Sequence, residues 1–320
     1  MSFRLPNPTI LFVAGLVLVV ALVVVQQHRG QSQATQPAYP SESVIQPPPP
    51  GSPTPVEIFQ RAVAVLESRR SISAHVGQTS EIFGRHPAGS GIYLEQRVPG
   101  ATLFRLEMRL QLDDQPSGLL QVCDGHSVWN YRQIFQEETL TRIDLDRVNH
   151  HLEEAGRWQP GTMGGLPGIG GLSRLMQAIG SNFNFTRADQ TLLRRQQVPT
   201  WRLEGLWTPA RLAQLLPEQA KSIQEGKSPS LSKLPKQVPD RVVVFLGMDD
   251  LFPYRIEYRR QPDKNESPDA TSDKILSAID FYEPVFDVPI PPTRFLYNPG
   301  KLEAKDETAR FLGAMGLSTK

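Results

Sequence analysis

The sequence predicts an α+β fold with one large antiparallel sheet, preceded by an N-terminal transmembrane helix. Three observations predict it. Residues 10–25 are an uninterrupted apolar run, residues 54–70 show apolar side chains at helical spacing, and a long series of later segments alternates apolar and polar residues. Alternation with a period of two is typical of strands that bury one face.

Composition excludes several function classes. The 320 residues contain 34 Lys and Arg against 33 Asp and Glu, a formal net charge of +1, so no electrostatic footprint for nucleic acid is expected. The only cysteine, Cys123, has no partner for an internal disulfide, and a four-sulfur zinc site is impossible. We expect neither a cofactor nor a metal.

The N-terminal run must be helical and must lie in lipid or in a translocon, because a bilayer core offers the backbone no water. Residues 9–26 just reach the length of an uncleaved anchor, about 17–25 residues. A cleaved signal peptide is the alternative, although the first small-x-small site, at 32–34, lies well beyond the apolar run. We expect residues 1–26 to be a signal anchor; either alternative exports the rest of the chain.

Residues 27–53 read as a proline-rich linker, with an unbroken run from Pro47 to Pro50. Such a segment favours polyproline II, and at about 3.1 Å per residue it could reach on the order of 85 Å. A plain spacer is the simpler interpretation and a proline-motif docking site the alternative. A folded domain follows at 54–300, and 301–320 is assigned as a C-terminal tail.

The domain begins with a helix signal. Thr54 as N-cap, Pro55 at N1 and Glu57 at N3 form a capping box. The helix is expected to end near Arg70 and to pack on a sheet through Val56, Phe59, Val63 and Leu66.

Alternation then predicts the strands. In Leu103–Leu112, every even-numbered position from Phe104 is apolar, and Asp124-Gly125 predicts a hairpin turn. The other predicted strands are 72–83, 91–98, 118–123, 127–135, 185–197, 200–207, 241–248, 253–260, 275–282 and 293–297.

Two stretches interrupt the strands. Gly161–Gly171 carries six glycines but lacks the Gly-Lys-Ser/Thr ending of a phosphate loop, so it is interpreted as a hinge. It precedes a helix with Leu172, Leu175, Met176 and Ile179 at helical spacing. Residues 209–237 are interpreted as an insertion.

Catalytic signals are weak. Adjacent His150 and His151 cannot easily share one metal on a helix, and His150 with Glu154 indicates a solvated i,i+4 pair. Cys123 has no visible catalytic context, and no Gly-x-Ser-x-Gly motif is present. We expect no enzyme and assign no catalytic residue.

Apolar and aromatic side chains remain as the candidate site. They are assigned to one face of the sheet, which is either an ordinary core or the lining of a cavity for an acyl chain; alternation does not decide between them. These residues are Phe104, Leu106, Met108, Leu110, Trp129, Tyr131, Tyr254, Ile256, Tyr258 and Phe281.

Three motifs resemble the LolA-type periplasmic lipoprotein-carrier superfamily, which includes LolB and RseB-like sensors. Gly91–Arg97 (GIYLEQR), a proline and Leu103-Phe104 resemble a "G-x-L-x-x-x-R-P-x-x-F" strand pair. Leu119–Tyr131 is similar to the family's "V-S-D-G-x-x-L-W-x-Y" hairpin, with Cys123 where serine is usual. Phe295–Gly300 resembles the C-terminal "F-x-F-x-P-x-G".

The resemblance implies an unclosed antiparallel half-barrel with a helical lid over a hydrophobic cavity for lipoprotein acyl chains. The helix carrying Leu172, Leu175, Met176 and Ile179 falls where the lid is expected, and Arg97 matches the arginine that locks it. A guanidinium suits that role because it offers five donors; a plain surface arginine is the alternative.

This chain differs from the soluble carrier of that superfamily, because it is expected to be anchored in the membrane and to carry insertions. We therefore expect non-catalytic binding of lipid or lipoprotein acyl chains on the periplasmic side of the inner membrane. The alternative is an envelope protein-interaction or sensor module with a filled half-barrel core.

Overall fold

The computed structural model describes residues 45–80, 88–112, 115–156, 170–261 and 273–317. It confirms an α+β fold with a large unclosed sheet. The predicted anchor at 1–26, most of the linker and most of the glycine-rich stretch lie outside the described residues. Within the described part, no helix is long and apolar enough to cross a membrane.

One 12-stranded sheet carries the fold, in the order β12-β6-β5-β4-β3-β2-β1-β11-β10-β9-β8-β7. Every pairing is antiparallel except that of β12 with β6. The strands are β1 (Ser71–Ser80), β2 (Ala88–Val98), β3 (Ala101–Leu112), β4 (Gln115–Cys123), β5 (Ser127–Ile134), β6 (Glu137–Asp144), β7 (Phe183–Leu193), β8 (Val198–Trp207), β9 (Arg241–Gly247), β10 (Pro253–Arg260), β11 (Lys274–Phe286) and β12 (Lys305–Asp306).

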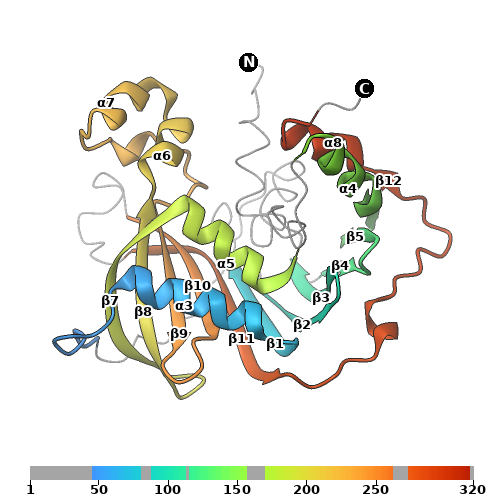
Figure 1. Cartoon of the computed structure of the whole chain (residues 1–320), viewed down its shortest axis with the longest axis horizontal. Helices are drawn as coiled ribbons and strands as arrows, with labels where there is room; N and C mark the ends of the chain where they lie inside the picture. The colour runs from blue at the N-terminus through green and yellow to red at the C-terminus, as the bar shows by residue number, and fades with distance from the viewer. Residues whose placement is uncertain (1–44, 81–87, 113–114, 157–169, 262–272, 318–320) are drawn as a thin grey trace.

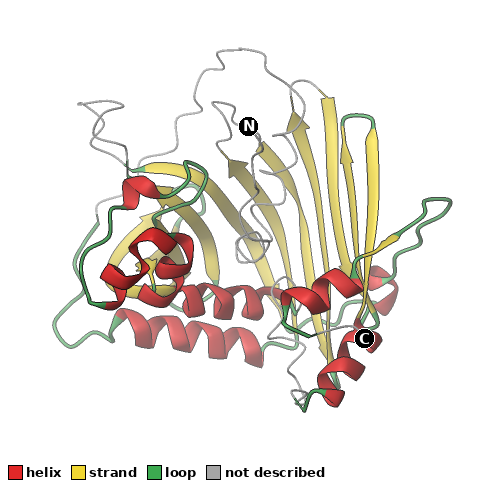
Figure 2. Cartoon of the chain, turned by 90° about the horizontal axis from the view of Figure 1, so that it is seen from above, coloured by secondary structure: helices red, strands yellow, loops and turns green. Residues whose placement is uncertain are grey.

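The sheet curves around its helices (Figure 1). Helices α3 (Pro55–Ser68) and α5 (Gly171–Asn182) run side by side across the concave face, and α4 (Leu145–Glu154) and α8 (Thr308–Ala314) cover its other end (Figure 2). The concave face therefore carries two apolar clusters, a larger one under α3 and α5 and a smaller one under α4 and α8.

The capping box at the start of α3 is confirmed: the Thr54 side chain accepts from the Glu57 amide, and the Glu57 carboxylate accepts from the Thr54 amide. The buried face of α3 differs from the predicted one: Ile58 and Ala62 are buried, whereas Val56 is exposed. Apolar residues at a helical period of 3.6 are found on both of these faces, so only the packing shows which one faces the sheet.

One predicted strand is absent, and one strand of the sheet interior, β6, was not predicted. Residues 293–297 do not form a strand; Pro292–Phe295 is a 3-10 turn that buries Phe295 against Leu94 and Leu103 on the convex face. Strand β6 was missed because its apolar residues, Leu140 and Ile143, lie three apart among threonines and charged residues, which breaks the alternation.

The predicted insertion and the predicted C-terminal tail both contain regular structure that packs on the domain. Residues 209–237 form α6 (Pro209–Leu215), α7 (Ala220–Gln224) and two 3-10 turns, with a separate apolar cluster of Leu212, Leu216, Ile223 and Leu234. Residues 301–317, assigned as a tail, include β12 and α8, and Phe311 and Leu312 pack in the smaller concave cluster.

Candidate functional site: the concave face and helix α5

The larger concave cluster gathers most of the residues expected to line a cavity. The strand register explains this, because cross-strand partners such as Met108, Gly91, Val76 and Phe281 lie in one row on the same face. The cluster contains Leu106, Met108, Leu110, Leu172, Met176, Ile179, Ile256, Tyr258 and Phe281, with Leu175 and Tyr254 partly buried at its margin.

Helix α5 covers this cluster on the side away from the sheet. Met176 and Ile179 are 0% exposed, so the underside of the helix is fully desolvated. Gly180 lets α5 approach α3, since a Cβ there would lie 2.7 Å from the Phe59 ring, which in turn stacks on Phe185 with centroids 4.2 Å apart. The concave face beneath α3 and α5 is thus covered by these two helices and shielded from solvent.

A polar group joins the start of α5 to the middle of the sheet. The Glu95 carboxylate, 1% exposed, accepts the Leu172 amide at 2.8 Å and the Tyr93 hydroxyl at 2.5 Å. Because the first amides of a helix lack partners within the helix, a carboxylate at this position stabilises the helix N-terminus. Glu95 therefore holds α5 by its backbone.

Arg97 holds the same turn by a side chain. Its Nη2 donates to the Ser173 hydroxyl at 2.8 Å, and the Leu66 carbonyl of α3 and a Glu95 oxygen lie 3.4 Å away. We call Tyr93, Glu95 and Arg97 of β2 with Leu172 and Ser173 of α5 the β2–α5 latch. The guanidinium assigned to lock the lid thus contacts both helices that cover the sheet.

Burial controls the electrostatics of the latch. It raises the pKa of Glu95, against the opposing effects of the Tyr93 hydroxyl, the Leu172 amide and the Arg97 charge. Burial and the neighbouring Glu95 charge also raise the pKa of Tyr93, so that its phenol remains a donor. The latch is therefore a buried carboxylate stabilised by three donors.

The backbone that enters α5 requires glycine. Gly170 and Gly171 have φ angles of 103° and 77°, which are left-handed values that L side chains rarely adopt. A Cβ on Gly171 would also lie 2.3 Å from Glu95 Oε2. The end of the glycine-rich stretch thus allows the carboxylate to reach the helix.

Three predicted lining residues lie elsewhere. Phe104 is on the concave face but packs in the smaller cluster under α4 and α8. Trp129 and Tyr131 pair with Val122 and Leu120, whereas Val128 pairs with Cys123 in that cluster. Since neighbouring residues of a strand face opposite sides, Trp129 and Tyr131 lie on the convex face, and their assignment to the lining was wrong.

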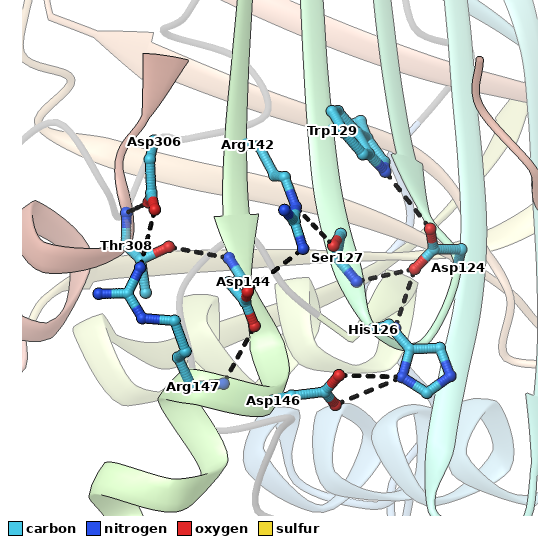
Figure 3. A network of polar contacts seen from close by, with 10 residues as sticks. All are labelled: Asp124, His126, Ser127, Trp129, Arg142, Asp144, Asp146, Arg147, Asp306 and Thr308. Atoms are coloured by element: carbon cyan, nitrogen blue, oxygen red, sulfur yellow. Dashed lines mark hydrogen bonds and ion pairs between the residues drawn. The ribbon is translucent and has the colours of Figure 1, made fainter. Parts of the chain in front are cut away.

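Trp129 instead belongs to a polar network around the β4–β5 turn (Figure 3). Its indole donates to Asp124 at 3.3 Å, and the Arg142 guanidinium lies 5.4 Å from its ring centroid. The network ties the C-terminal segment to the sheet through Arg147–Asp306 at 2.8 Å, and through the Thr308 hydroxyl, which accepts the Asp144 amide.

The described residues contain no group of three or more His, Cys, Asp or Glu placed to hold a metal ion. His150 and Glu154 form an exposed i,i+4 pair at 3.5 Å. Burial raises the pKa of Cys123 to about 12, so that its thiol is a poor nucleophile.

Sequence reasoning missed Tyr93, Glu95 and Ser173 of the latch. Strand β2 is apolar on both faces, with Ile92 and Leu94 opposite Tyr93, so its pattern does not reveal which face Glu95 occupies. A carboxylate two residues before the expected locking arginine was the available signal.

No protein-family model and no curated protein matches the sequence. Solved structures similar to it include a DUF1329 family protein from Desulfovibrio piger, with 10% identity and a TM-score of 0.32 over 76% of this chain and 96% of that one. A putative outer-membrane lipoprotein-sorting protein domain from Vibrio parahaemolyticus has 10% identity and a TM-score of 0.31, over 75% and 95%.

The Pseudomonas aeruginosa MucA/MucB complex is also similar, with 10% identity and a TM-score of 0.36 over 76% of this chain. The match spans about three fifths of the other chain, 61%. At such identities and TM-scores these neighbours carry no argument about family, ligand or partner, so the functional proposal rests on the residues of this chain.

Proposed function

We propose that the domain binds acyl chains of lipid or lipoprotein between its concave face and α5, without catalysis. The observation that carries the proposal is the contrast between the two attachments of α5. Beyond its first turn the buried face of α5 is apolar, whereas its first turn is also fixed by a few polar contacts to Glu95 and Arg97. Breaking those contacts would remove the polar attachment of a helix that covers a largely apolar floor.

An acyl chain is the ligand chemistry that this floor favours. Val244, Ile256, Ile279 and Phe281 of adjacent strands form an apolar surface beneath α5. Exposed to water, such a surface would cost about 25 cal/mol per Å², so α5 must be replaced by another apolar group when it lifts. A flexible hydrocarbon chain meets that need, and Met176 adapts to its shape.

Two native tryptophans make the proposal testable in the full chain. Trp201 and Trp207 pack against the concave cluster, whereas residues 1–26 contain no tryptophan. The full chain with Trp129→Phe and Trp158→Phe is reconstituted in phosphatidylcholine vesicles whose acyl chains carry bromine at mid-chain. Bromine quenches indole fluorescence only at short range.

We expect quenching of Trp201 and Trp207 relative to unbrominated vesicles. A matched chain that keeps only Trp129, on the convex face, should not be quenched. Equal fluorescence of Trp201 and Trp207 in brominated and unbrominated vesicles would contradict acyl binding at the concave face.

A second function is favoured by the burial of the concave face. With α3 and α5 in place, most side chains of the larger cluster are buried, as in an ordinary core. We therefore keep an envelope protein-interaction module as the alternative. It predicts no quenching, and a domain that keeps its function when α5 is held closed.

A further inference from the structure

We propose that the concave face carries a polar subsite for the carbonyl of an acyl ester or amide, with the Tyr258 hydroxyl as hydrogen-bond donor. The subsite comprises Tyr258, Ser277, Ser80 and Gln78. The inference rests on the proposed function and adds to it where the head end of the acyl chain lies and which linkage the protein recognises.

The register brings these side chains together. Tyr258 of β10 pairs with Ser277 of β11, which pairs with Ser80 of β1. Gln78 lies two residues before Ser80 and therefore on the same face. Each of the four is buried, with exposed fractions between 3% and 7%. Four polar side chains thus form one patch on an otherwise apolar face.

The hydroxyl of Tyr258 has no hydrogen-bond partner among the residues that the structure describes, although its residue is only 5% exposed. Buried polar atoms are nearly always bonded, and an unsatisfied one costs about 1–3 kcal/mol. Burial also raises the pKa of Tyr258, so its phenol is protonated and can donate. The group is a neutral donor awaiting an acceptor.

The neighbouring donors are already engaged. Gln78 Nε2 donates to Ser80 Oγ at 3.4 Å, and Ser277 donates to the Thr79 carbonyl at 3.3 Å. The two serine hydroxyls also contact each other at 3.2 Å, and either of them can donate in that contact. The hydroxyls and amide of Gln78, Ser80 and Ser277 therefore bond to one another and to the backbone, whereas the hydroxyl of Tyr258, the strand neighbour of Ser277, takes no part in these bonds.

The four side chains of the subsite are uncharged, so the subsite favours a neutral acceptor over a carboxylate. Arg260, two residues along β10, already donates to the carbonyls of Leu234, Pro235 and Val238. A free carboxylate bound here would have no cation among the four side chains, and burying an unpaired charge is costly. A neutral carbonyl satisfies the Tyr258 donor without that cost.

The row of residues next to the subsite on the same face is apolar, so it can contact the hydrocarbon chain of the ester. Ile256 and Ile279 are cross-strand partners one row from Tyr258 and Ser277, and Val244 continues that row. An acyl ester can therefore place its carbonyl at Tyr258 while its chain follows the apolar floor beneath α5.

The test compares ester and ether lipids, since an ether-linked chain has the same length but no carbonyl. The full chain with Trp129→Phe and Trp158→Phe is placed in vesicles of unbrominated ether-linked phosphatidylcholine. Increasing fractions of a chain-brominated ester phosphatidylcholine, or of its ether analogue, are added, and quenching of Trp201 and Trp207 is followed.

We expect the ester to reach half-maximal quenching at about a five- to tenfold lower mole fraction, as one hydrogen bond provides. Tyr258→Phe should abolish that preference while leaving the melting temperature unchanged or higher, because the lost hydroxyl bonds to no described residue. Tyr282→Phe, on the convex face of β11, is the matched control and should retain the preference.

Equal quenching by ester and ether would overturn the subsite and mean that water alone satisfies Tyr258, while acyl binding stands. An ester preference that survives in Tyr258→Phe would also overturn it. If neither lipid quenches, the proposed function fails and the subsite with it. Ser277→Ala is the second variant, expected to weaken the ester preference by removing the neighbouring hydroxyl.

Discussion

The Nη2 atom of Arg97 lies 2.8 Å from the hydroxyl of Ser173, so a charge-assisted hydrogen bond joins strand β2 to the first turn of α5. Ser173 is fully buried, which shields this bond from competing water. The contact therefore ties the first turn of α5 to strand β2.

Ser173→Ala removes that bond without changing the shape of the buried site. We expect the attachment of α5 to weaken by about 1–2 kcal/mol, because hydrogen bonds to charged groups contribute that order of free energy. Amide hydrogen exchange across Leu172–Asn182 should accelerate about tenfold, with strands β9 and β10 unchanged.

Ser181→Ala is the control on the same helix, since the Ser181 hydroxyl is exposed and bonds only to the Gln177 carbonyl of its own turn. Exchange in α5 that is the same in both variants would contradict a specific role for the Arg97–Ser173 bond.

The latch should also depend on pH through Glu95. Its folded-state pKa is raised above the ordinary value of 4.5, so the folded protein binds this proton more tightly than the unfolded chain does. The stability that this residue contributes is therefore full below pH 4.5 and is lost as pH rises through the folded pKa.

Glu95→Gln removes the titration. We expect the wild type to gain stability relative to Glu95→Gln as pH falls from neutral toward 4.5, measured by urea unfolding at a series of pH values. A pH-independent gap between wild type and Glu95→Gln would contradict the prediction.

Gly171→Ala should destabilise the fold for two separable reasons. The φ angle of 77° is strained for alanine, and the new Cβ would lie 2.3 Å from Glu95 Oε2. We expect a loss of about 2–4 kcal/mol in the free energy of unfolding. Gly226→Ala is the matched control, because Gly226 has φ 78° with nothing within 4 Å.

The two variants distinguish the cost of the left-handed backbone angle, which both share, from the cost of the clash with Glu95, which only Gly171→Ala has. Gly226→Ala should cost about 1 kcal/mol, the backbone term alone. If both substitutions cost the same, the close approach of Glu95 to α5 is not what requires glycine at position 171.

Cys123 should be inert in the folded protein. It is buried, and desolvation raises the pKa of its thiol to about 12, so almost no thiolate exists at neutral pH. We expect no modification by iodoacetamide at pH 7.5 and stoichiometric modification in 6 M guanidinium. Modification of the native protein at the rate of a free thiol would show that the end of β4 opens.

Local chemistry was the part of the fold that the sequence predicted well. The capping box at Thr54 and the Asp124-Gly125 turn depend only on neighbouring residues, and both are found as expected, with Gly125 at φ 96°. The alternation of Leu103–Leu112 likewise depends on one strand and one buried face.

The sequence did not show which face of the sheet a side chain occupies or which distant residue it contacts. Trp129 and Val128 are both apolar, and only the pairing with β4 shows which of them faces the concave side. Glu95 and Ser173 lie 78 positions apart, and their meeting in the latch depends on the path of the whole sheet. Strand β6, which is half exposed, takes its place from its neighbours rather than from its own residues.

Mapping of acyl contacts by photo-crosslinking tests the central claim most directly. The full chain is reconstituted in vesicles that contain a phosphatidylcholine with a diazirine in its acyl chain, irradiated and analysed by peptide mass spectrometry. We predict adducts on the concave residues of β9, β10 and β11 and on the underside of α5, around Met176. Adducts confined to residues 1–26 would contradict acyl binding by the folded domain.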